Sequence, residues 1–359
     1  MKKKLKKILG KASIRKKKDV NIRFEEAVQN LPKITNDTVA EHREEVLSTA
    51  RKYIYPLQHS KHRVVFISTS LFATAAVVFF GYCLLALYHF QSTSSFIYGV
   101  TEVIPFPIAK AGPNFVSYEN YLFQLRHYIH YYQTQGRVNF ASTAGQQQLF
   151  SYERQALQQV IDYSYIKQLA REHNISVSAQ DINNEINLLR SENRLGANQA
   201  EFESVLSNFW GWTVSDFKRE LSEELLTQKV VSALDTATHL KAQTALQALK
   251  SGTPFATVAT QYSEDIATKA NGGQFGFTIT SDNQNLPAQT LNALLALKPG
   301  QYSGVINLGN ALEIDEVISN TNGNIQAAHI LFNFNNITSY IQPLMNKEKP
   351  SVYITIPKS

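Results

Sequence analysis

The longest apolar stretch of the chain runs from Val64 to Tyr88 and contains no charged residue. About 20 apolar residues suffice for a helix to cross the hydrocarbon core of a bilayer. The pattern therefore predicts one transmembrane helix over residues 64–90, with residues 64–88 in contact with the lipid bilayer. A cleavable signal peptide has a short charged segment before a shorter apolar stretch, whereas 63 residues precede this one, so we interpret it as an uncleaved anchor.

Charge is distributed unevenly on the two sides of this stretch. Residues 1–63 contain 17 Lys and Arg against 7 Asp and Glu, whereas residues 89–108 contain no Lys or Arg. Because the basic flank of a membrane helix stays in the cytoplasm, we expect a basic cytoplasmic tail over residues 1–63 and the C-terminal domains outside a cell membrane crossed once. The rest of the chain is mildly acidic, which argues against a nucleic acid partner.

The polar and apolar pattern next predicts a linker and an all-helical domain. Serines and prolines over residues 91–113 favour an extended linker. Apolar residues recur at helical spacing over residues 114–235, which predicts a helical domain. Turn signals divide that domain into helices over residues 117–135, 146–173, 179–192, 199–209 and 214–234. Another helix is predicted within the tail, over residues 37–54.

The remaining residues show a mixed pattern. Residues 236–335 combine helical spacing with glycine-containing turns and two apolar runs, 311–319 and 325–332. A five-residue connection that contains Asn-Gly joins these runs, which predicts a β-hairpin. Residues 336–359 predict a tail with a short helix over residues 337–347 and then an extended strand, with no assigned packing partner.

Residue chemistry excludes several classes of site. The single cysteine, Cys83, rules out an internal disulfide and a multi-cysteine metal centre. The sequence contains no glycine-rich phosphate loop and no serine nucleophile elbow. Histidines on the predicted helices lack acidic or cysteine partners at ligand spacing; they are His127, His130, His173 and His239. We therefore expect neither a cofactor nor a metal.

The helical domain resembles a known family. A long helix that ends in VIDYSYIKQLAREHNI is followed by SVSAQDINNEINLLR and then by AEFESVLSNFWGWTVSDFKRELSEELLTQKV. This order is similar to the N-terminal helical domain of SurA/PrsA-type extracytoplasmic chaperones. Val177, Ser178 and Asp181 stand where the family pattern places such residues, whereas the spacing from Leu206 to Gly211 is one residue longer.

Residues 236–335 resemble a parvulin (PpiC-type rotamase) domain. The family's marks appear in order as LKSG, Phe255, YSED, GGQFGF and LKPGQYS. The resemblance implies an α+β fold with a four-stranded antiparallel sheet, helices around it, and peptidyl-prolyl cis-trans isomerase activity. The expected fold class of the whole chain is thus α+β, with a transmembrane helix, a helical chaperone domain and a parvulin-like domain.

The order of elements departs from the family. Parvulin domains open with a strand of the type SHILV, but residues 232–248 read as a helix. A similar pattern, AAHILF, follows the closing strand and places His329 in the family's first-histidine position. One interpretation is a circularly permuted domain. The other is a truncated second parvulin repeat that begins at residue 325.

The resemblance assigns candidate site residues. Asp265 occupies the family's Cys/Asp position, and His329 its first histidine, so these two are the predicted catalytic residues. The predicted pocket for the proline ring consists of Phe275, Leu286 and Leu291. Asp265 could instead cap a turn, His329 could be an ordinary half-buried histidine, and the three apolar residues could be core. The closing strand has Ala311 where the family has its second histidine, so the histidine pair is broken.

Three functional classes follow from these patterns. The first is a membrane-anchored isomerase and foldase whose partners are unfolded or newly exported polypeptides with X-Pro bonds. The second is a holdase chaperone whose degenerate parvulin domain binds without turnover. The third is a scaffold subunit in which the helical domain docks a partner. Asp265 and Phe275 favour the enzyme, whereas Ala311 favours the holdase.

Overall fold

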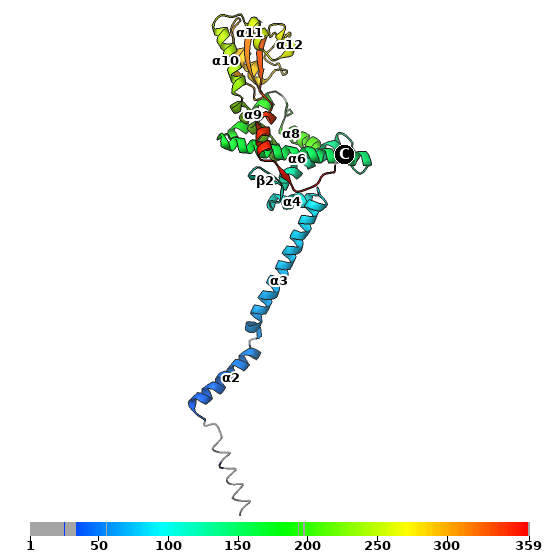
Figure 1. Cartoon of the computed structure of the whole chain (residues 1–359), viewed down its shortest axis with the longest axis vertical. Helices are drawn as coiled ribbons and strands as arrows, with labels where there is room; N and C mark the ends of the chain where they lie inside the picture. The colour runs from blue at the N-terminus through cyan, green and yellow to red at the C-terminus, as the bar shows by residue number, and fades with distance from the viewer. Residues whose placement is uncertain (1–24, 26–33, 55, 193, 197, 358–359) are drawn as a thin grey trace, which may run out of the picture. The chain divides into compact units, whose positions relative to one another are not determined.

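The described part of the chain comprises residues 25, 34–54, 56–192, 194–196 and 198–357 of a computed structural model (Figure 1). Most of the predicted cytoplasmic tail lies outside these residues. The chain divides into two units, residues 1–82 and residues 83–359.

The first unit is helical where it is described. Helix α2 (Asn36–Ile54) confirms the helix predicted over residues 37–54, and α3 (Pro56–Leu84) continues into the short π-helix η1 (Leu85–His89). By length and composition, the helical stretch Arg63–His89 could cross a membrane. Most of its apolar side chains from residue 64 to residue 80 are exposed.

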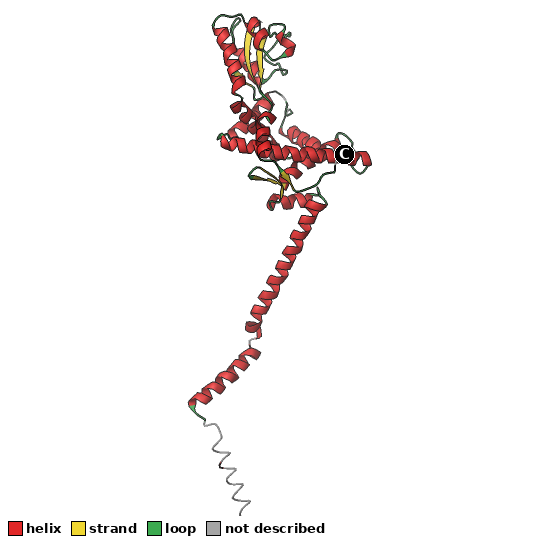
Figure 2. Cartoon of the chain, in the orientation of Figure 1, coloured by secondary structure: helices red, strands yellow, loops and turns green. Residues whose placement is uncertain are grey.

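Helices also dominate the region between this stretch and residue 235 (Figure 2). We call this region the helical domain. Its elements are α4 (Ser95–Val103), β1 (Pro107–Ala111), β2 (Asn114–Ser117), α5 (Tyr118–Thr134), α6 (Thr143–Glu172), α7 (Ala179–Ser191), α8 (Gln199–Val205), the π-helix η2 (Leu206–Trp210) and α9 (Val214–Leu234). The five helices predicted for this region are present within a few residues of their expected bounds.

Local sequence explains where two of these helices begin. The Ser178 side chain accepts the Asp181 backbone N–H, and Asp181 accepts the Ser178 backbone N–H in return. Thr213 and Asp216 form the same reciprocal arrangement at the start of α9. Each capping box satisfies two backbone donors that the first turn of a helix leaves unpaired.

The expectation of an extended linker over residues 91–113 is wrong. This segment contains α4 and β1, and Ile97 and Ile108 are buried. Its serines act as caps instead, because the Ser94 side chain accepts the Ile97 backbone N–H at the start of α4. The same polar residues that favour a linker by composition therefore begin a helix here.

The last residues belong to the helical domain. Strand β6 (Ser351–Val352) pairs antiparallel with β1, which also pairs with β2, so the order of this small sheet is β2-β1-β6. Helix α14 (Thr338–Lys347) packs against α6, and the Tyr165 hydroxyl donates to the Glu348 carbonyl. The predicted helix and strand are both present, but the described residues 336–357 are not a separate tail.

Residues 236–335 form what we call the sheet domain, inserted between α9 and α14. Its elements are α10 (Thr236–Lys250), α11 (Phe255–Tyr262), α12 (Ile266–Lys269), α13 (Ala288–Ala296), β3 (Ile306–Asn307), β4 (Ala311–Thr321) and β5 (Asn324–Asn333). The predicted hairpin is confirmed, because β4 and β5 pair antiparallel from Ala311↔Asn333 to Thr321↔Asn324. Figure 1 shows this hairpin in orange beside α10 and α11.

The two faces of the hairpin pack against different elements. Even-numbered residues such as Ile314, Ile330 and Phe332 form a core with α10 and α11. On the other face, Val317 and Ala327 pack with Leu294 of α13. Because side chains of a strand alternate between faces, Asp315 and His329, which are opposite in register, lie on this second face.

The expected four-stranded sheet is wrong, since the sheet has three strands in the order β3-β4-β5. The segment after α12 pairs with the outer edge of β5 in two isolated bridges, Gln274↔Ala328 and Ile279↔Ile325. Gly276 stands between them with a φ of 77°, outside the β region. That residue interrupts the regular ladder that a fourth strand would need.

The end of β5 lies beside the start of α10. The Asn335 backbone N–H and side-chain amide donate to Asp235, at 2.7 and 3.0 Å, and Asp235 also caps α10 by accepting the Thr238 backbone N–H. The strand therefore ends where a parvulin's opening strand would lead into its first helix. It also belongs to the same sheet as β4, which is the arrangement that the permuted interpretation predicts.

Candidate active site

The candidate site lies on the second face of the β4-β5 hairpin, around His329. The His329 side chain is 9% exposed, and its backbone N–H donates to the Gly273 carbonyl at 2.9 Å. The ring of Phe275 lies 4.4 Å from the imidazole ring, centroid to centroid. The glycine turn thus brings an aromatic ring and the strand histidine together.

Two carboxyl groups contact the two nitrogens of this histidine. Nε2 lies 2.9 Å from Oδ2 of Asp265, and Nδ1 lies 2.5 Å from Oε1 of Glu313. Burial opposes the charged imidazole, but the two carboxylates outweigh it and raise the pKa of His329. The structure thus brings together the two predicted catalytic residues.

Asp265 is also a helix cap, which is the structural alternative considered for this residue. It accepts the Ala267 backbone N–H at 3.1 Å and the Thr268 hydroxyl at 2.5 Å at the start of α12. Burial favours its neutral form, but the hydrogen bonds from Thr268 and His329 outweigh burial and lower the pKa of Asp265. Its side chain remains 23% exposed, so the carboxylate can meet a ligand that His329 cannot reach directly.

The sequence analysis missed Glu313 and Asp315. Glu313 lies two residues beyond Ala311, the position at which the family's second histidine was sought, and on the same side of β4. Burial and the neighbouring Glu313 raise the pKa of Asp315 and so favour its neutral form. The available signal was Glu313 and Asp315 at alternate positions of a mainly apolar strand, in ALEIDEVIS, where they share one face and Glu316 lies on the other.

The three predicted pocket residues join one apolar cluster on this face. Leu286 is buried in it, whereas Phe275 and Leu291 are partly buried and pack against it. Phe275 also lies near Phe277, which is 41% exposed. Phe275 is thus the predicted pocket residue in contact with His329, and Leu286 serves mainly as core.

The arrangement suits a reaction that needs no nucleophile and no metal. Rotation about an X-Pro bond is opposed by a barrier of about 18–20 kcal/mol that reflects lost amide resonance. A catalyst lowers it by binding the twisted amide better than the planar one. An apolar ring beside a fixed group of charges is a suitable surface for that purpose.

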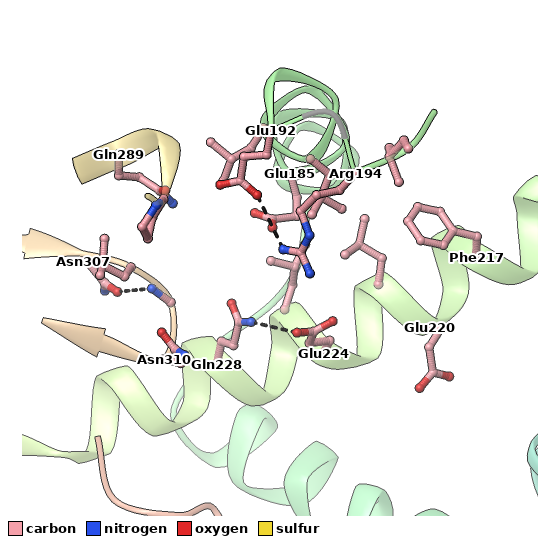
Figure 3. A pocket seen from close by; sticks show the side chains of 18 of the residues that line it. Glu185, Glu192, Arg194, Phe217, Glu220, Glu224, Gln228, Gln289, Asn307 and Asn310 are labelled. Atoms are coloured by element: carbon pink, nitrogen blue, oxygen red, sulfur yellow. Dashed lines mark hydrogen bonds and ion pairs between the residues drawn. The ribbon is translucent and has the colours of Figure 1, made fainter. Parts of the chain in front are cut away.

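A cleft of about 1500 Å³ lies between the helical domain and the sheet domain (Figure 3). On one side it is lined by side chains of α7, η2 and α9, including Leu188, Trp210 and Leu221. On the other side it is lined by residues 284–287 and 307–310, so Leu286 borders this cleft as well. Figure 3 shows Glu185, Glu192 and Glu224 on the helical side facing Asn307 and Asn310.

The π-helix η2 explains the extra residue between Leu206 and Gly211. A π-turn takes one more residue than an α-turn, and such turns occur often at functional sites. It places Trp210 against His127 and Tyr131, at ring-centroid distances of 4.7 and 4.8 Å. His127 is therefore part of an aromatic stack that joins α5 to η2.

Comparisons with known proteins give two matches along the chain. Residues 58–231 match the family model of the SurA-like N-terminal domain, and residues 225–319 match the family model of the PPIC-type PPIASE domain. The chain is thus similar to a SurA-like N-terminal domain in one part and to a PPIC-type PPIASE domain in the next. The second match ends within β4, so β5 and His329 lie outside it.

Individual relatives are similar over part of their length. The chain is 29% identical over 179 residues to chaperone SurA of Methylobacillus flagellatus, which covers 45% of this chain and 40% of that protein. The chain therefore spans less than half the length of this curated relative. A crystal structure of foldase protein PrsA from Streptococcus pneumoniae has 20% identity and a TM-score of 0.19, with 53% of this chain and 75% of that chain covered.

Proposed function

We propose that this protein is a membrane-anchored, extracytoplasmic foldase that combines chaperone activity with peptidyl-prolyl cis-trans isomerase activity. Its substrates would be unfolded or newly exported polypeptides with X-Pro bonds. The observation that carries the proposal is the contact between Asp265 and His329 beside Phe275. Asp265 and Phe275 lie within the residues that match the PPIC-type PPIASE domain. His329 completes this site from a strand that follows the matched residues.

The location of the protein is part of the proposal. The apolar helix Arg63–His89 would anchor the chain in the membrane, and the basic residues before it would remain in the cytoplasm. The helical and sheet domains would then act on chains that emerge on the outer side.

A protease-coupled assay on a short X-Pro peptide tests the isomerase. We expect the full chain in detergent micelles to accelerate isomerisation, and we expect the double variant Asp265→Ala, His329→Ala to lose the acceleration. The matched control is Asp282→Ala, His173→Ala, which removes the same two residue types from exposed positions. No acceleration by the unmodified chain would contradict isomerase activity on this substrate.

A holdase without turnover is the second candidate, because of the cleft between the two domains and Ala311 at the position of the family's second histidine. Leu188 lines that cleft and is partly buried, whereas Leu240 is 68% exposed outside it. If clients bind in the cleft, Leu188→Glu should weaken suppression of client aggregation, whereas Leu240→Glu should not. Aggregation suppressed equally well by both variants would contradict client binding in this cleft.

A further inference from the structure

Glu313 is a buried acid in a position where burial has a cost. Glu313 is 3% exposed, and the residues on either side of it in β4, Leu312 and Ile314, are apolar. Burying a carboxylate is unfavourable unless it is paired and hydrogen-bonded. Here Oε2 accepts the Thr290 hydroxyl of α13 at 2.5 Å, and Oε1 faces Nδ1 of His329 at 2.5 Å. Both oxygens are thus engaged.

The geometry restricts the protonation of His329. A neutral imidazole carries one N–H, so it can donate to only one of two carboxylates. His329 faces a carboxylate at each nitrogen, and each carboxylate also receives a hydroxyl, from Thr290 or from Thr268. The Thr268 oxygen lies 3.0 Å from Nε2 as well, and since its O–H donates to Asp265, that oxygen can accept from Nε2. An imidazolium, which donates from both nitrogens, satisfies every one of these contacts.

We propose that Glu313 is the positioning residue of the candidate site, which fixes the His329 ring and keeps it protonated, so that His329 in turn holds Asp265 as an oriented carboxylate. Glu313 thereby fixes His329 in a site where Ala311 stands at the position of the family's second histidine. This inference rests on the proposed isomerase function. Glu313 acts through His329 and does not itself touch a substrate.

The charges around His329 are few. The titratable groups that face it are Glu313 and Asp315 from β4 and Asp265 from the start of α12. Glu313 and Asp265 form ion pairs with His329 and with no Lys or Arg among the described residues. Loss of the charge at Glu313 therefore removes about half of the negative charge that retains the imidazole proton.

The test is a pH titration of His329 in the full-length protein, in detergent micelles, by long-range ¹H–¹⁵N NMR with labelled histidine. His329→Gln assigns the signal. We expect both ring nitrogens to be protonated at pH 7 in the unmodified chain, and Glu313→Gln to lower the His329 pKa by one unit or more. Glu316→Gln, a substitution on the opposite face of the same strand, is the control and should change nothing.

Turnover gives the second readout. Glu313→Gln should lower kcat with KM little changed, by a factor that approaches roughly tenfold per unit of lowered His329 pKa at a pH above both pKa values, and activity should recover as the pH is lowered. A neutral His329 in the unmodified chain at pH 7 overturns the inference, even if the variant does not fold. An unchanged titration with normal turnover overturns it as well. If His329 titrates as expected but neither the unmodified chain nor any variant accelerates isomerisation, the proposed isomerase function is wrong. The proposed role of Glu313 in catalysis is then wrong as well.

Discussion

Burial of the Asp315 carboxyl opposes its ionisation, and this makes the stability of the fold depend on pH. It is fully buried, and its pKa is raised above that of the unfolded chain by burial and by Glu313. Between the unfolded and folded pKa values the folded state binds the extra proton, so the free energy of unfolding falls as the pH rises above about 4. The raised pKa of His329 acts in the same direction at higher pH, because its contribution is lost as the pH rises through the folded value.

We predict that Asp315→Asn makes the sheet domain less sensitive to pH. Asparagine has nearly the shape of the neutral acid but cannot ionise, so the variant's advantage in free energy of unfolding should grow with pH, by at most about 1.4 kcal/mol per unit. Denaturant unfolding at pH 5.5, 6.5 and 7.5 measures it. Parallel pH profiles for the two chains would show that Asp315 is not neutral in the folded protein.

Gly273 is required for a different reason, namely close backbone approach. Its φ is 82°, and a Cβ added there would lie 2.2 Å from the His329 carbonyl oxygen. Gly276 has a similar φ of 77° but nothing within 4 Å of such a Cβ. The two glycines therefore share backbone strain and differ in the clash.

Gly276→Ala should cost about 1–2 kcal/mol of stability, the strain of a left-handed alanine. Gly273→Ala should cost about 1–3 kcal/mol more, because overpacking adds to the strain, and it should displace His329. Thermal unfolding of both variants measures the difference. Equal losses would mean that the turn and β5 are not in the contact described here.

At the scale of elements, the sequence predicted which helices and strands exist better than it predicted what each of them packs or pairs with. The helices of the helical domain follow from apolar spacing and from caps such as Ser178 and Thr213, which act locally. The prediction of a linker over residues 91–113 is wrong because serines and prolines are compatible with either a linker or a capped helix. The fourth strand was expected by family analogy, and the φ of Gly276 that prevents it is not visible in the sequence.

The candidate site was predicted only in part for a similar reason. Asp265 and His329 were found by the family pattern, and the structure brings them within 2.9 Å. Glu313 was missed because the pattern directed attention to Ala311. Which residue of a strand reaches across to its neighbour depends on register, and a single sequence does not fix register across a hairpin.

The permuted interpretation of the sheet domain can be tested by reversing the order of its segments. Because Asn335 contacts Asp235 at the start of α10, a chain that reads residues 324–335 followed directly by residues 236–321 should keep the same contacts. We predict that this rearranged chain unfolds cooperatively and shows a protonated His329. The control is a chain of residues 236–335 in their natural order, which should show the same two properties. A collapsed state without either property would contradict the permuted interpretation.

At the scale of the whole molecule, the chain combines a basic, apolar N-terminal part with mildly acidic domains. If residues 64–88 span a membrane, the full chain should remain in the membrane fraction after alkaline carbonate extraction, whereas deletion of these residues should release it. Protease added outside intact cells or spheroplasts should digest the two domains and spare an N-terminal tag. Release of the unmodified chain by carbonate, or digestion of the tag, would contradict the anchored topology.

The central claim is that a site built by Asp265, His329 and Phe275 accelerates rotation about X-Pro bonds. The most direct measurement is NMR exchange spectroscopy on a short X-Pro peptide, with the full chain present at a small fraction of the peptide concentration. We predict that cis/trans exchange is faster with the unmodified chain than in peptide alone, and that it returns to the uncatalysed rate with the folded Asp265→Ala, His329→Ala variant. Exchange at the uncatalysed rate with the unmodified chain would contradict it.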